Sequence, residues 1–288
     1  MKRLILVLSV VTVAWACDGK GSSPLPTSPS PAPSPTPPTA PPAEMLPIYG
    51  YVDDTAFRAI GGVIIQIVDG PQAGTMTTSD VGGRFSYDGT FAFPVTLRAS
   101  KDGYTTSTRT TLRLTDGHAY AGFQLASVTP PVAVAGNYTL TISADPACTA
   151  LPGDVRTRTY QAAVSVNTYG GNTAGTSFHG VVTGAQFAPN ANLFFVGVFG
   201  DYVNTSTIGE GPSIVEQVGP NRYVAFSGEA GLSVGPAGRA TISAPFKGTI
   251  EYCELKSAIG QYYDCSQALA AVREECTSNN GQLTMTRQ

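Results

Sequence analysis

Few residues of this chain belong to the types that carry out nucleophilic chemistry. The 288-residue sequence has two histidines, His118 and His179. One serine, Ser233, stands between Gly231 and Gly235 in the Gly-x-Ser-x-Gly spacing that presents a nucleophile on a strand-to-helix turn. That turn needs a helix after the serine and a histidine later in the chain, yet a predicted strand follows and both histidines precede Ser233. We therefore interpret residues 231–235 as a glycine-rich hairpin turn.

Acidic residues offer a second candidate for acid–base work. His179, Glu216 and Glu229 fall on three predicted strands, and a histidine with two carboxylates is sufficient for general acid–base catalysis. Isolated acids on strands are more often solvated or paired with an arginine such as Arg156 or Arg158. The sequence also has no glycine-rich phosphate loop. We expect a protein that is not an enzyme and needs no cofactor, with an uncharacterised hydrolase as the minor alternative.

The N-terminus has the pattern of an export signal. Lys2 and Arg3 precede an apolar run over residues 4–16, which is shorter than the about 20 residues needed to span a bilayer. The run ends in Ala-Trp-Ala before Cys17 and resembles the lipobox of bacterial lipoproteins; an ordinary signal peptide is the alternative. The resemblance implies that residues 1–16 are removed and that Cys17 is acylated. The exported chain would then be anchored to the cell envelope, facing the periplasm or the cell surface.

Residues 17–47 are predicted to be a disordered stalk. Eleven of the chain's 22 prolines lie between residues 22 and 47. Proline removes a backbone donor, and a segment with few bulky apolar residues cannot bury enough surface to fold. The whole chain has a net charge of −3, so no basic face is expected and nucleic acid is excluded as a partner.

Residues 48–127 are predicted to form a seven-stranded β-sandwich. Short alternating runs separated by Gly, Pro, Asn and Asp recur about every ten residues, which is typical of all-β sandwiches. The expected strands are residues 48–52, 62–68, 74–78, 84–87, 95–99, 105–114 and 120–125.

Four motifs in this region resemble the carboxypeptidase regulatory-like domain, a transthyretin-like module of bacterial envelope proteins. They are Gly50-Tyr-Val-Asp, Ile60-Gly-Gly-Val-Ile, Thr78-Ser-Asp-Val-Gly-Gly-Arg-Phe and Lys101-Asp-Gly-Tyr. The resemblance implies a spacer or a sandwich with carbohydrate-binding relatives. It does not imply a peptidase, because two histidines in different domains cannot supply the zinc ligands. Within the third motif, Asp80 is expected to accept hydrogen bonds from the backbone of its own turn.

Residues 136–288 are predicted to form an antiparallel β-barrel of eight or nine strands. Tyr160, Ala162 and Val164 alternate with small or polar residues, so one face of that strand is apolar. Residues 137–144 and 282–287 are the first and last strands, and their pairing would remove both sheet edges. The result resembles a lipocalin-like barrel in architecture only.

The remaining four cysteines, all in this domain, predict disulfides. They are Cys148, Cys253, Cys265 and Cys276. An even number in an exported chain favours disulfides, with three possible pairings, and the absence of a Cys-x-x-Cys pair argues against metal. If the first and last barrel strands pair, Cys148 lies beside Cys276. Cys253 and Cys265 would then close a loop, after which residues 266–276 are expected to form a short amphipathic helix.

Binding is favoured over catalysis, although the ligand is open. Many aromatic residues of the barrel would either fill its core or line a pocket: Tyr160, Phe187, Phe194, Phe195, Phe199, Tyr202, Tyr223 and Phe226. Tyr262 and Tyr263 form the exposed pair that we expect to contact a ligand. The first hypothesis is a membrane-anchored binding or adhesion module for a polysaccharide, a small ligand or an envelope protein. The second is a structural spacer without a ligand, which a solid barrel interior would favour.

Overall fold

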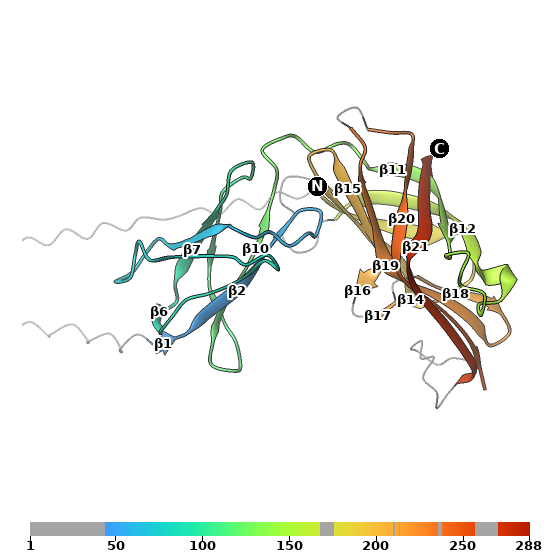
Figure 1. Cartoon of the computed structure of the whole chain (residues 1–288), viewed down its shortest axis with the longest axis horizontal. Coiled ribbons are helices and arrows are strands. Elements are labelled where there is room, and N and C mark those ends of the chain that lie inside the picture. The colour runs from blue at the N-terminus through green and yellow to red at the C-terminus, as the bar shows by residue number, and fades with distance from the viewer. Residues whose placement is uncertain (1–43, 168–175, 210, 213, 236–237, 257–269) are drawn as a thin grey trace, which may run out of the picture. The chain divides into compact units, whose positions relative to one another are not determined.

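A computed structural model describes residues 44–167, 176–209, 211–212, 214–235, 238–256 and 270–288 (Figure 1). The predicted signal peptide, Cys17, all but the end of the stalk, Tyr262, Tyr263 and Cys265 lie outside these ranges. In the described part of the chain, no helix has the length and hydrophobicity to cross a membrane.

The chain is all-β, as predicted, and its first part contains two four-stranded sheets, ordered β5-β2-β10-β9 and β4-β3-β7-β8. Their strands are β2 (Ile48–Asp54), β3 (Ile64–Ile67), β4 (Met76–Thr78), β5 (Arg84–Ser86), β7 (Thr96–Ser100), β8 (Ser107–Thr110), β9 (Leu112–Arg113) and β10 (Ala119–Leu125). A further pair, β1 (Glu44–Leu46) and β6 (Phe91–Phe93), forms a two-stranded sheet. The inner faces of the sandwich enclose a core that includes Val52, Ile65, Leu97 and Phe123.

The predicted strand over residues 105–114 is split between the two sheets. Its first half is β8 and its second half is β9, with the buried Thr111 between them. The backbone N–H of Thr111 donates to the Val95 carbonyl at 2.8 Å, and its hydroxyl accepts from the Val95 N–H at 3.1 Å. These bonds hold the chain where it crosses from one sheet to the other. If β8 and β9 are counted together as the one strand predicted over residues 105–114, the two sheets contain the seven predicted strands.

The second part is a closed eight-stranded antiparallel barrel. Its strands follow the order β13-β12-β11-β21-β20-β19-β15-β14, and β14 pairs with β13 to complete the ring. They are β11 (Gly136–Ser143), β12 (Thr157–Val166), β13 (Ser177–Thr183), β14 (Phe187–Phe199), β15 (Tyr202–Ser206), β19 (Arg222–Ser233), β20 (Thr241–Leu255) and β21 (Ala270–Arg287). The predicted pairing of the first and last strands is present, with Leu140 opposite Met285.

Two short strands, β15 and β18 (Ile214–Gly219), share one place in the barrel wall, between β14 and β19. Both β15 and β18 pair with β14 on one side and with β19 on the other, and they use different stretches of each partner. Between them the chain leaves the sheet as a small hairpin of β16 (Ile208–Gly209) and β17 (Gly211–Pro212). The predicted alternatives of eight and nine strands therefore differ by whether β15 and β18 count as one interrupted strand or as two.

The barrel interior holds a large buried core. Inward-facing side chains form a single cluster that includes Tyr138, Leu140, Tyr160, Phe194, Phe226, Phe246 and Met285. A barrel of eight strands is just wide enough for its own side chains to fill it. Of the predicted aromatic residues, Tyr160, Phe194 and Phe226 lie in this cluster. They build the core rather than line a ligand cavity.

The helix expected over residues 266–276 is wrong for the part that the structure describes. Residues 270–276 belong to β21, which pairs with β20 from Leu255 opposite Ala270 through Ile250 opposite Cys276 and beyond (Figure 1). Alanine and glutamate favour helix in this segment, but local propensity is a weak preference that tertiary pairing overrides. The ladder with β20 supplies that pairing.

The structure joins Cys148 to Cys276, which is the predicted pairing, across a Cα–Cα distance of 5.7 Å. Cys148 follows β11 and Cys276 lies on β21, so the bond reinforces the seam between the first and last strands. Cys253 is also disulfide-bonded. Its predicted partner, Cys265, lies outside the described residues.

Replacing both Cys148 and Cys276 with alanine should lower the free energy of unfolding by about 2–4 kcal/mol. The bond links residues 128 positions apart, and its loss frees the denatured chain. Urea unfolding followed by circular dichroism measures the change. The Thr149→Ala variant changes the residue next to Cys148 but keeps the disulfide, so its urea midpoint should equal that of the wild type. An unchanged midpoint for the double alanine variant would mean that the disulfide does not stabilise the seam.

Candidate functional site

The structure does not bring His179, Glu216 and Glu229 together as a catalytic group. Glu216 is buried at 3 % exposure and packs with inward-facing side chains of the barrel. His179 and Glu229 alternate with buried neighbours on β13 and β19, so they lie on the outer face. The Nε2 atom of His179 lies 3.1 Å from the Ser165 hydroxyl. Ser165 and His179 lie on the neighbouring strands β12 and β13, and no hydrogen bond or ion pair among the described residues joins His179 to Glu216 or Glu229.

Glu216 instead anchors a buried ion pair. Arg158 donates through Nε to its carboxylate at 2.7 Å and forms a second, shorter bond through its terminal nitrogen. The Tyr160 hydroxyl donates to the same carboxylate at 2.8 Å. Burial and the neighbouring Glu216 raise the pKa of Tyr160 well above its usual range, so the phenol stays protonated. The alternative that the sequence offered, in which one of these acids pairs with Arg158, is therefore confirmed for Glu216.

Breaking this pair should destabilise the barrel. The Arg158→Met variant leaves a buried carboxylate without its cation, and we expect it to lower the free energy of unfolding by about 3 kcal/mol. Adding Glu216→Gln removes the charge while keeping an oxygen acceptor for Tyr160, so the double variant should recover part of the loss. Chemical denaturation of the four members of the cycle measures this. A double variant less stable than Arg158→Met would contradict the assignment.

Two other motifs have structural roles. Ser233 ends β19 opposite Tyr202, so it does not stand at a strand-to-helix turn. The hairpin turn predicted over residues 231–235 is wrong for residues 231–233, which pair with β15 in the sheet. Asp80 accepts hydrogen bonds through Oδ1 from the backbone N–H groups of Gly82 at 2.8 Å and Arg84 at 2.9 Å. Gly83 in the same turn has φ +79°, a conformation that glycine adopts without strain. The turn role predicted for Asp80 agrees with this geometry.

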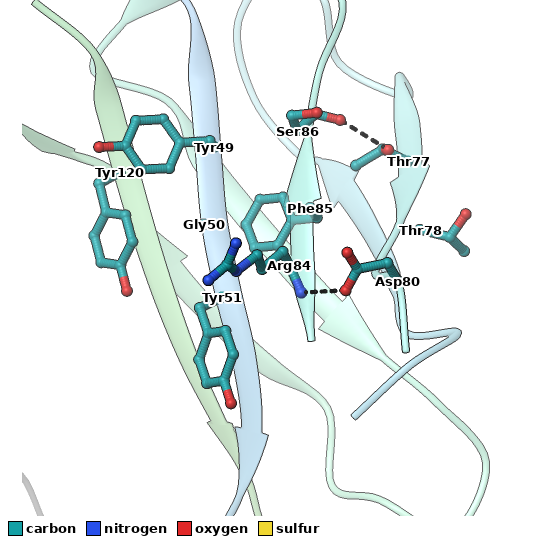
Figure 2. A pocket seen from close by; sticks show the side chains of 10 residues that line it. All are labelled: Tyr49, Gly50, Tyr51, Thr77, Thr78, Asp80, Arg84, Phe85, Ser86 and Tyr120. Atoms are coloured by element: carbon teal, nitrogen blue, oxygen red, sulfur yellow. Dashed lines mark hydrogen bonds between the residues drawn. The ribbon is translucent and has the colours of Figure 1, made fainter. Parts of the chain in front are cut away.

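A groove on the outer face of the sandwich is a candidate binding site (Figure 2). It has a volume of about 590 Å³ and is open to solvent. Such a volume falls in the range of small-ligand sites. Its lining residues come from β2, β4, β5, β10 and the turn after β4: Tyr49, Gly50, Tyr51, Thr77, Thr78, Asp80, Arg84, Phe85, Ser86 and Tyr120.

Three tyrosines are brought together by the register of β2 and β10. Residues 48, 50 and 52 of β2 are buried, so Tyr49 and Tyr51 point to the opposite, outer face. The parallel pairing places Tyr120 opposite Tyr49 and Gly122 opposite Tyr51. The rings of Tyr49 and Tyr120 meet edge to face at 5.7 Å between centroids. The result is an aromatic surface on the outer face of the central strands.

Two glycines make room for this surface. A Cβ on Gly50 would lie 2.4 Å from the ring of Phe85, so Gly50 allows Phe85 to pack beneath β2. A Cβ on Gly122 would lie 3.1 Å from the Tyr120 hydroxyl, which shows that the Tyr120 side chain lies along β10 over Gly122. A larger residue at position 122 would displace that ring.

Arg84 brings a cation to the tyrosines. It lies on β5 opposite Tyr51, and its guanidinium extends over β2 toward Gly50 (Figure 2). Within the described residues, only its backbone takes part in hydrogen bonds, and its side chain forms no ion pair. A guanidinium carries five N–H donors in a planar fork. These donors are available to a ligand in the groove.

Two tyrosines of the groove, Tyr49 and Tyr51, have a raised pKa and remain neutral phenols. Burial and the nearby Asp116 raise the pKa of Tyr49, whose hydroxyl donates to Asp116 at 3.3 Å. Burial and the nearby Asp53 raise the pKa of Tyr51. Neutral phenol rings present apolar faces together with hydroxyl donors. The groove can therefore both stack on a flat apolar surface and form hydrogen bonds at its rim.

The sequence reasoning missed this groove. The aromatic pair that it singled out, Tyr262 and Tyr263, lies outside the described residues, so that prediction stays open. The signal for the groove was present in the alternation of Tyr49 and Tyr51 with apolar or glycine residues on β2. What the sequence could not supply was the parallel pairing with β10, which places Tyr120 opposite Tyr49, 71 residues earlier in the chain.

Comparisons with known proteins do not add a family. No family model matches the chain, and no curated protein matches it at a significant level. The likeness of residues 48–127 to carboxypeptidase regulatory-like domains therefore rests on the four motifs and stays a prediction.

Asp53, the next outward residue of β2 after Tyr51, gives the sandwich a pH dependence. Burial, and then the neighbouring Asp54, raise the pKa of its carboxyl to about 6. The folded state thus holds a proton that the unfolded chain releases near its ordinary pKa of 3.8. This contribution to stability is complete below about pH 4 and is lost as the pH rises through 6.

The Asp53→Asn variant should therefore be more stable than the wild type above pH 6, and the difference should shrink toward pH 4. Asparagine keeps an acceptor for the Gln124 side chain, which bonds to Asp53. Thermal melting of both proteins between pH 4 and 7 measures the difference in stability. The other acids titrate in both proteins, so their effect cancels in that difference. A gap independent of pH would show that Asp53 does not titrate in this window.

Proposed function

We propose that this chain is a non-catalytic, lipid-anchored lipoprotein of the cell envelope that binds polysaccharide through the groove of its sandwich domain. The observation that carries the proposal is the grouping of Tyr49, Tyr51 and Tyr120 around Arg84 on one solvent-facing surface. Pyranose rings present apolar C–H faces to aromatic side chains and hydroxyls to polar ones. The groove offers both kinds of partner.

The anchor and the stalk complete the proposal. Acylation at Cys17 would hold the protein to a membrane, and the proline-rich segment after it would act as a semi-rigid spacer of about 3.1 Å per residue. A binding domain on such a spacer would reach polysaccharide beyond the membrane surface. Both elements lie outside the described residues and rest on the sequence.

The second hypothesis, a structural spacer, retains support from one part of the molecule. The barrel interior is filled by its own side chains, so this domain has no need of a ligand. We assign the barrel a supporting role and place recognition on the sandwich. The charged residues that line the site, Arg84 and Asp80, also do not form the paired acid and base that a hydrolase would need.

The test is glycan binding by the full-length chain in detergent. Wild type should bind polysaccharides on a glycan array, and the Tyr49→Ala/Tyr120→Ala variant should bind at least about tenfold more weakly, because truncating an anchoring aromatic costs more than about 1.4 kcal/mol. Tyr49→Phe, which keeps the ring, should lose much less. Calorimetry with a bound glycan gives the affinities.

The Tyr262→Ala/Tyr263→Ala variant separates this site from the one that the sequence first indicated. Loss of binding only in that variant would move recognition to the other loop. Absence of glycan binding by a folded wild-type protein would count against the proposal and favour the spacer.

A further inference from the structure

The charges around the groove bear on the kind of polysaccharide that it accepts. Arg84 and Asp80 both line it. Asp116 lies against the Tyr49 hydroxyl, and hydrogen bonds from His118 keep the pKa of its carboxyl below its usual range, so it is ionised at neutral pH. One cation thus faces two carboxylates. A polyanionic chain would meet no net attraction here.

The polar groups match hydroxyls instead. Arg84 offers donors only, a carboxylate such as that of Asp80 accepts only, and the Thr78 and tyrosine hydroxyls do both. Oδ1 of Asp80 already serves its turn, while Oδ2 accepts no hydrogen bond from the described residues. A donor fork and an acceptor in the same groove suit sugar hydroxyls, because each hydroxyl both donates and accepts.

The shape of the groove bears on which part of the polysaccharide is bound. The site is lined by outward-facing residues of β2 and β10 and by residues of the edge strand β5, and it is open to solvent. Tyr49 and Tyr51 are two residues apart on β2, so they stand about 6.7 Å from each other along the strand. Successive rings along a strand can contact successive sugar units. A site for a chain end would instead need a wall that stops the chain.

From these observations we infer that the groove binds the interior of a neutral polysaccharide chain, with sugar rings against the tyrosines and hydroxyls bonded to Arg84 and Asp80. This inference rests on the proposed function and specifies its ligand class. It excludes polyuronates and other acidic glycans as the preferred ligand.

The experiment compares the full-length chain with neutral oligosaccharides of increasing length and with oligouronates, by calorimetry at low and high salt. Neutral oligomers should bind with affinity that rises with length and then levels off. Their affinity should change less than about twofold when the salt is raised tenfold, since no net charge is neutralised. Capping both ends of the oligomer should leave the affinity unchanged. Arg84→Gln should weaken binding about tenfold, while Arg109→Gln, a matched change outside the groove, should not.

Two outcomes would overturn the inference while leaving the proposed function intact. One is tighter, salt-sensitive binding of oligouronates that is lost in Tyr49→Ala/Tyr120→Ala. The other is loss of neutral binding when the ends are capped. If no glycan of either class shows binding that depends on these tyrosines, the proposed function itself fails.

Discussion

The two-residue alternation of β2 is the constraint on which the sandwich and its site both depend. Ile48 and Val52 are buried in the core, and between them Tyr49 and Tyr51 face outward. A register slip of one residue would exchange the two faces. The tyrosines would then enter the core and the groove would vanish. Because the slip would also expose the apolar side chains, the stability of the fold and the geometry of the site are maintained by the same pairing.

The barrel is stabilised by a different set of interactions, none of which needs a ligand. Pairing of β11 with β21 closes the sheet, the Cys148–Cys276 bond lies at that seam, and Glu216 is neutralised by Arg158 inside the wall. The interior is occupied by large side chains such as Tyr138 and Phe246. A domain built in this way is suited to support. The proposal therefore places recognition on the groove of the sandwich, which is lined by Arg84 and three tyrosines.

The sequence predicted the features that depend on local pattern. Alternation over residues 160–164 indicated the barrel strand, and the positions of Cys148 and Cys276 at the two ends of the domain indicated their bond. The pairing of the first and last barrel strands was also predicted, but other features that depend on long-range pairing were missed. Residues 270–276 have helical propensity but join β20, and residues 105–114 look continuous but divide at Thr111. The groove belongs to the same class, since Tyr120 reaches Tyr49 only through a parallel pairing that no local pattern announces.

The edge strand β5 bears on what kind of molecule the groove can recognise. An exposed strand edge usually invites another strand, and a peptide could bind there by extending the sheet. Here the turn that holds Asp80 and the neighbouring β4 occupy that edge. The Asp80 N–H donates to the Arg84 carbonyl at 2.8 Å, the Arg84 N–H donates to Asp80, and the Thr77 hydroxyl donates to the Ser86 carbonyl at 2.9 Å (Figure 2). With these backbone groups already bonded, recognition falls to the side chains above them. Phenol rings, a guanidinium and hydroxyls suit a sugar chain better than they suit an added strand.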